Sequence, residues 1–210
     1  MRILTSLLAT LLLLPLALPA TAQNKVKTSQ VAPEATAPAS SQDTKDDQAN
    51  GQEQAVPEVI RDVSRLPEKV RQTRERILEA ARSGDLNKVV TVMQMNETMP
   101  VFSFGGGGND PVEYWKSNYP DSEGLEVLGI LVDVLEAPFV HMDKGTPQEM
   151  YVWPYFYGIP LNQLTPEQKV EIFRLVTGSD WREMQEFGAY IFFRVGISPS
   201  GVWHFFVAGD

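Results

Sequence analysis

Apolar residues are distributed unevenly along this chain, and this limits where a folded domain can form. Residues 23–55 contain only two large apolar side chains, Val26 and Val31, among small and polar residues. Such a stretch buries too little surface to offset the entropy lost on ordering its backbone, so we expect a disordered linker. Residues 56–210 are rich in Val, Leu, Phe, Tyr and Trp. We therefore expect a single domain over residues 56–210.

The first 22 residues have the features of a secretory signal peptide. Arg2 precedes an apolar run that reaches Leu18, and small residues follow up to Ala22. This pattern predicts export with cleavage after Ala22, to the periplasm or the medium. Because the run is shorter than the ~20 residues that span a bilayer and contains Pro15, we expect no membrane span after cleavage. An uncleaved anchor is the alternative.

Cysteine content and charge exclude several functions. The sequence has no cysteine and a net charge of −9. Disulfides, cysteine nucleophiles and thiolate metal ligands are therefore excluded, and nucleic acid is a poor partner because binding it requires neutralising phosphates. Residues 61–88 hold eight basic and five acidic side chains, whereas residues 89–210 hold six and sixteen. We expect the basic segment to face the acidic remainder of its own domain, with an anionic partner as the alternative.

The first part of the domain has the pattern of helices. Apolar spacing predicts a helix over residues 67–83 that Gly84 ends, and Asp85 then caps a second helix. Asp110 begins a capping-box pattern with a proline after it, which predicts a short third helix. Residues 124–137 are apolar enough for a helix or a buried strand, and we expect a helix.

The second part alternates between strands and short helices. Strands are expected at residues 139–143, 149–157, 189–197 and 202–208, and helices over 165–178, with Val170, Phe173 and Val176 inward, and over 179–188. The last two strands flank a turn containing Pro199 and Gly201 and should form a hairpin. Both faces of this hairpin are apolar, so either helices cover both, or one face lines a pocket or an interface.

Together these elements predict an α+β domain, in which N-terminal helices pack on a small antiparallel sheet that ends in a C-terminal hairpin, with a helical insertion. Residues 145–155 and 188–210 resemble an uncharacterised family of exported proteobacterial proteins, and this resemblance implies no activity. The helical corner at residues 82–86 and the strand that leads to Gly209 are also similar to the nuclear-transport-factor-like cone, the cystatin-like fold of ketosteroid isomerases. The insertion at residues 165–187 departs from that cone.

A run of four glycines lies at residues 105–108. A phosphate-binding loop would need a Lys-Ser/Thr pair entering a helix, and this pair is absent. We expect a mobile loop here, with a lid as the alternative.

Two histidines and two acidic residues are the candidates for acid-base chemistry. His141 and Asp143 would project from one face of a strand, and Glu149 begins the next strand. His204 lies on the hairpin, so it would join them only if the strands are neighbours. No ligand-spacing motif connects the histidines, and we expect structural roles for both, no metal site and no cofactor.

Four aromatic residues are the candidates for ligand binding: Tyr151, Trp153, Tyr155 and Tyr157. On a continuous strand they share one face, which would contact a cell-wall fragment or an apolar small molecule, or an envelope protein. The alternative is that they fill the core.

Two functions therefore stay open. The first, which we favour, is a non-catalytic envelope protein that binds through this aromatic face or a pocket. The second is a small hydrolase or isomerase with an acid-base site in a cone-like pocket.

Overall fold

The computed structural model describes residues 56–104 and 108–209. The signal peptide and linker predicted for residues 1–55, and the loop predicted around residues 105–107, lie outside the described residues. Among the described helices, none combines the length and the apolar character needed to cross a bilayer.

Four helices form the first part of the domain, and all four were predicted: α1 (Glu68–Arg82), α2 (Leu86–Met93), α3 (Pro111–Asn118) and α4 (Leu125–Glu136). The Asp85 carboxylate accepts from the Asn87 N–H at the start of α2, and Asp110 caps α3 in the same way. Helix α4 resolves the choice between helix and strand. Its buried residues, Leu128, Leu131 and Leu135 among them, lie three and four positions apart on one face.

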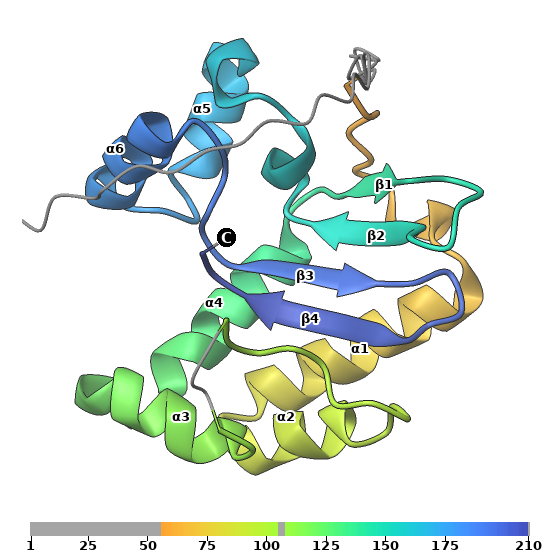
Figure 1. The fold of residues 1–210 in the computed structure, drawn as a ribbon, viewed down its shortest axis with the longest axis vertical. Coiled ribbons are helices and arrows are strands. Elements are labelled where there is room, and N and C mark those ends of the chain that lie inside the picture. The colour runs from red at the N-terminus through yellow and green to blue at the C-terminus, as the bar shows by residue number, and fades with distance from the viewer. Residues whose placement is uncertain (1–55, 105–107, 210) are drawn as a thin grey trace, which may run out of the picture. The chain divides into compact units, whose positions relative to one another are not determined.

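The sheet has four antiparallel strands in the order β1-β2-β3-β4, shown in Figure 1. They are β1 (Val140–Met142), β2 (Met150–Trp153), β3 (Arg194–Ile197) and β4 (Trp203–Val207). Single bridges lie along both outer edges, Ile60 with Phe139 beside β1 and Val101 with Phe205 on β4. The sheet and its terminal hairpin confirm the predicted α+β fold.

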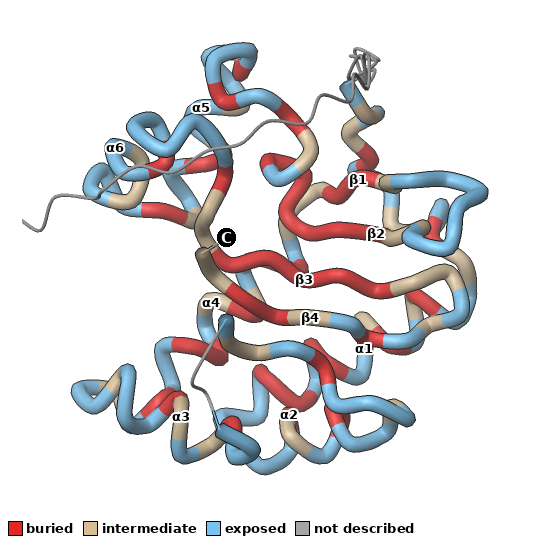
Figure 2. Tube along the Cα trace, in the orientation of Figure 1, coloured by how far each residue is buried: buried red, intermediate tan, exposed pale blue. Residues whose placement is uncertain are grey.

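Each face of the sheet contributes to a different buried cluster. Trp153, Val195 and Phe206 pack with α1, α2 and α4, and Figure 1 shows α1 and α4 running behind the strands. Val152 on the other face packs with the 3-10 segments Tyr155–Gly158 and Leu161–Gln163 and with helices α5 (Pro166–Ile172) and α6 (Gly178–Phe187). Figure 2 shows β3 buried along its whole length. On β4, the side chain of His204 is exposed. Helical segments therefore pack on both faces, as the first of the two predicted arrangements requires.

The strands are shorter than their sequence patterns predicted. The strand expected over residues 149–157 ends at Trp153, and the chain continues as the 3-10 segment Tyr155–Gly158. Pro154, which follows a cis peptide bond, has no N–H to donate to a neighbouring strand. The strand expected from residue 189 begins only at Arg194.

The predicted inner face of the insertion is only partly correct, because Val176 is buried but the other two side chains predicted inward are not. Val170 is 69% exposed and Phe173 is 48% exposed, whereas Ile172 is buried. The helix expected over residues 165–178 is shorter than predicted, because α5 ends at Ile172. The helix expected over residues 179–188 is observed as α6, which Thr177 starts with its own capping box. Phe173 and Val176 therefore lie beyond the end of α5 and share no helical face with Val170, although the predicted start of α5 at Thr165 is confirmed.

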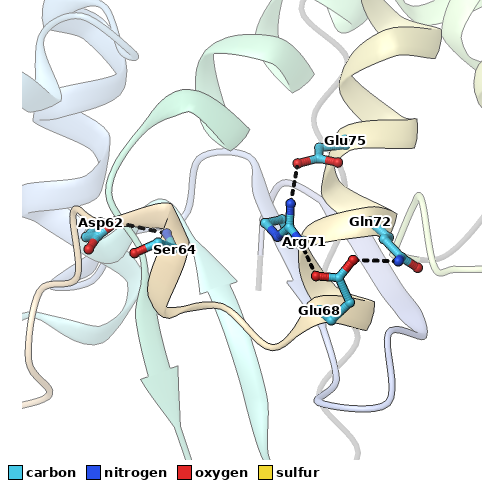
Figure 3. Close-up of polar contacts among 6 residues, drawn as sticks. All are labelled: Asp62, Ser64, Glu68, Arg71, Gln72 and Glu75. Atoms are coloured by element: carbon cyan, nitrogen blue, oxygen red, sulfur yellow. Dashed lines mark hydrogen bonds and ion pairs between the residues drawn. The ribbon is translucent and has the colours of Figure 1, made fainter.

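Several charged side chains of α1 are paired within the domain. Arg71 contacts Glu68 and Glu75 on the same helix, as Figure 3 shows. Arg82 pairs with Glu136 on α4. Such surface pairs contribute little to stability. They fit the expectation that the basic segment faces its own domain.

Candidate binding groove

A groove of about 680 Å³ lies between α1, the segment 95–101 that follows α2, and the tip of the β3–β4 hairpin. We call it the methionine groove. It is lined by Thr73 and Arg76 of α1, by Val92 of α2, by Met95, Asn96, Glu97, Thr98, Met99 and Val101, and by residues 200–204 of the hairpin. The segment 95–101 is anchored to β4 of the sheet at Val101. The Val101 N–H donates to the His204 carbonyl at 2.9 Å, and the Val101 carbonyl accepts from the Phe206 N–H at 2.8 Å.

Four large apolar side chains line this groove while exposed to solvent. Met95 is 64% exposed, Val101 47%, Val202 37% and Met99 36%. A monomeric protein leaves few such side chains together on its surface, and a cluster of them marks a site of contact with a ligand or partner. Methionine adapts its shape to different apolar surfaces because its side chain is unbranched and polarizable.

Partly buried hydrogen bonds join the hairpin tip to α1 on one side of the groove and to the segment 95–101 on the other. Thr73 Oγ1 donates to the Gly201 carbonyl at 2.7 Å and accepts from Arg76 Nη2 at 2.8 Å. On the other wall, Asn96 Oδ1 accepts from the Trp203 N–H at 3.0 Å. These contacts connect helix, loop and hairpin, so the groove is formed before any ligand arrives.

His204 is the only predicted candidate residue that lines the methionine groove. Its side chain is exposed, but neighbouring atoms exclude part of the water around the imidazole, and this lowers the pKa of the imidazole. His141 lies on β1 and His204 on β4, which are the opposite edges of the sheet. The condition for a joint site, neighbouring strands, is therefore not met.

His141 and Glu149 do come together, across the turn that joins β1 and β2. His141 Nε2 lies 2.7 Å from Glu149 Oε1, and Glu149 Oε2 accepts from the Gly145 N–H at 3.0 Å. The Gly145 N–H, and after it His141, lower the pKa of the Glu149 carboxyl. The imidazole also stacks on the Tyr151 ring with centroids 4.1 Å apart. Both carboxylate oxygens are thus engaged, so the pair holds the turn in shape.

Asp143 does not share a strand face with His141. The strand β1 ends at Met142, and Asp143 follows it with a φ of 51° in the left-handed region. The carboxylate therefore belongs to the turn, and the expected alignment of the two side chains is wrong.

The four aromatic candidates do not form one face. Tyr151 and Trp153 are buried in the cluster with α1 and α4, whereas Tyr155 is buried in the cluster with α5 and α6. Tyr155 donates to Glu171 Oε2 at 2.7 Å, and its burial raises the pKa of the phenol. Only Tyr157 is exposed, at 43%. The reason is local: the chain leaves the strand after Trp153, so alternation no longer holds.

Among the described residues, no group of three or more His, Asp or Glu side chains is placed to hold a metal ion. Apart from His204, the residues that line the methionine groove were not found from the sequence. Three apolar side chains, Met95, Met99 and Val101, stand in a polar stretch without helical or strand periodicity. That irregularity was the available signal.

Comparison of the chain with known protein families, with curated proteins and with solved structures gave no match. The resemblances noted from the sequence therefore stay predictions, and the function is argued from the groove.

Proposed function

We propose that this chain is an exported, non-catalytic envelope protein that binds an extended apolar segment of a partner protein in the methionine groove. The observation that carries this proposal is the convergence of Met95, Met99, Val101 and Val202, all exposed, on one groove whose walls are already hydrogen-bonded in place. Export is the expectation from the N-terminal sequence pattern.

An extended segment fits the chemistry of the wall better than a purely apolar molecule does. Between Met95 and Met99 the wall carries Asn96, Glu97 and Thr98, and Arg76 faces it from α1. A peptide offers apolar side chains to the methionines and backbone N–H and C=O groups to these polar side chains. A small apolar molecule would offer no hydrogen-bond partner to Glu97 and Thr98.

The experiment is an NMR titration of the chain labelled with ¹³C at the methionine methyl groups, using a blocked hexapeptide of alternating leucine and serine. We expect saturable shifts of the Met95 and Met99 signals and no shift of Met184, which is buried in the other cluster. Shifts spread equally over all three methionines, or none at Met95 and Met99, would contradict the proposal.

Two matched substitutions locate the contact. Val202→Thr removes a methyl from the groove, and Val170→Thr makes the same change at an exposed position of α5. Burial of one methyl contributes about 0.8 kcal/mol, so Val202→Thr should weaken peptide binding about fourfold. Val170→Thr should leave the affinity unchanged. Equal affinities for the two variants would place the contact elsewhere.

The hydrolase or isomerase alternative is supported by the distance of 2.7 Å between His141 Nε2 and Glu149 Oε1. General acid-base catalysis requires such a pair within reach of a bound substrate. Neither residue lines the methionine groove, and both oxygens of Glu149 already accept hydrogen bonds or pair with the imidazole. We therefore place catalysis second.

A further inference from the structure

Arg194, at the start of β3, is a buried cation in an unusual setting. It is 6% exposed, and its Nη1 donates to the Gly209 carbonyl. Its guanidinium carbon lies 5.1 Å from the centre of the Tyr157 ring and 5.5 Å from that of Phe104. Both rings are themselves half-exposed, at 43% and 50%. We call these three side chains the arginine cluster.

The arginine cluster is assembled from three separate parts of the chain. Phe104 precedes α3, Tyr157 lies in the 3-10 segment after β2, and Arg194 pairs with Val207 at the far end of β4. The methionine groove uses residues 200–204, at the other end of that strand. The two sites are therefore distinct.

The charge of Arg194 has no carboxylate partner among the described residues. None of the ion pairs formed between them includes it. A buried charge in a folded protein is normally paired, because its desolvation costs several kcal/mol per ion and needs compensation. A guanidinium has five N–H donors, and the bond to Gly209 uses one of them. The cation–π contacts with the two rings supply part of the compensation.

We propose that the arginine cluster binds a sugar that carries a carboxylate. The guanidinium matches a carboxylate with two parallel hydrogen bonds, which is the geometry that arginine favours. The half-exposed rings of Phe104 and Tyr157 give the apolar C–H face of the sugar a surface on which to pack. A free phosphate would use the guanidinium alone and leave both rings without a role. This inference goes beyond the peptide groove and does not depend on it.

The test is an NMR titration of the full chain with D-glucuronate, followed at the Arg194 Nε–H and at the ring signals of Phe104 and Tyr157. Glucose and inorganic phosphate serve as comparison probes. We expect saturable shifts with glucuronate, binding of phosphate at least about tenfold weaker, and no saturable shift with glucose. Equal affinities for phosphate and glucuronate would show an adventitious ion only.

Variants separate binding from folding. Arg194→Met should abolish the glucuronate response while leaving the urea midpoint close to that of the wild type, because an apolar side chain of similar volume replaces a buried charge without loss. Phe104→Ala and Tyr157→Ala should each weaken binding about tenfold. An unchanged response in Arg194→Met would overturn the proposal.

Asp210 lies outside the described residues, and in the sequence it follows Gly209, whose carbonyl accepts from Arg194. Asp210→Asn tests whether the Asp210 carboxylate occupies the site. We expect the same affinity for glucuronate as in the wild type. Binding that appears only in Asp210→Asn would show that the protein's own carboxylate occupies the site, and would refute a sugar acid as the ligand.

Discussion

The tip of the β3–β4 hairpin meets helix α1 so closely at Gly201 that a single methyl group should disturb it. Gly201 has a φ of +86°, and a Cβ at this position would lie 2.9 Å from both the carbonyl oxygen and the Cβ of Lys69. Gly145 has a similar φ of +77°, but a Cβ there would meet no atom within 4 Å. Alanine at Gly145 therefore introduces backbone strain alone, whereas alanine at Gly201 adds a collision with the helix backbone.

The two variants separate these costs. A non-glycine residue in the left-handed region costs about 1–2 kcal/mol, and an extra methyl group in a tightly packed site costs about 1–3 kcal/mol. We expect Gly145→Ala to lower the free energy of unfolding by about 1–2 kcal/mol and Gly201→Ala by about 2–5 kcal/mol. Urea unfolding measures both, and the m-value should not change. A difference below about 0.5 kcal/mol would refute the close docking of hairpin on helix.

Two further predictions concern polar side-chain groups. Trp203 Nε1 donates to the Phe205 carbonyl at 2.9 Å, whereas Trp153 Nε1 is buried without an acceptor among the described residues. Trp203→Phe should therefore lower the free energy of unfolding by about 1 kcal/mol more than Trp153→Phe does, because only the first variant loses a hydrogen bond. Urea unfolding measures both. The hydrogen bond from Arg61 lowers the pKa of Glu171 from its ordinary 4.5, so its stabilising effect is present above pH 4.5 and is lost as the pH falls through the lowered value. In thermal unfolding, the difference between wild type and Glu171→Gln should therefore shrink below pH 4.5, and a constant difference would contradict this.

Local signals in the sequence predicted the helices well. Asp85, Asp110 and Thr165 each cap a helix where the pattern placed them, because capping needs only a side chain and the N–H groups two or three residues later. The turn at residues 198–201 was predicted for the same reason. The residues of α5 that face inward were not predicted correctly, because their burial depends on where the helix ends and on what packs against it.

The candidate sites lie where the chain departs from regular structure, and this is why periodicity did not find them. Met95 and Met99 follow the end of α2, Tyr157 follows the break at Pro154, and Phe104 precedes α3. In such segments the exposure of a side chain depends on tertiary contacts. The burial of Arg194 was also not predictable from periodicity. A charged residue in a strand is expected to face water, yet the rings of two distant segments cover it. Its setting follows from the meeting of three segments, which spacing along the chain does not encode.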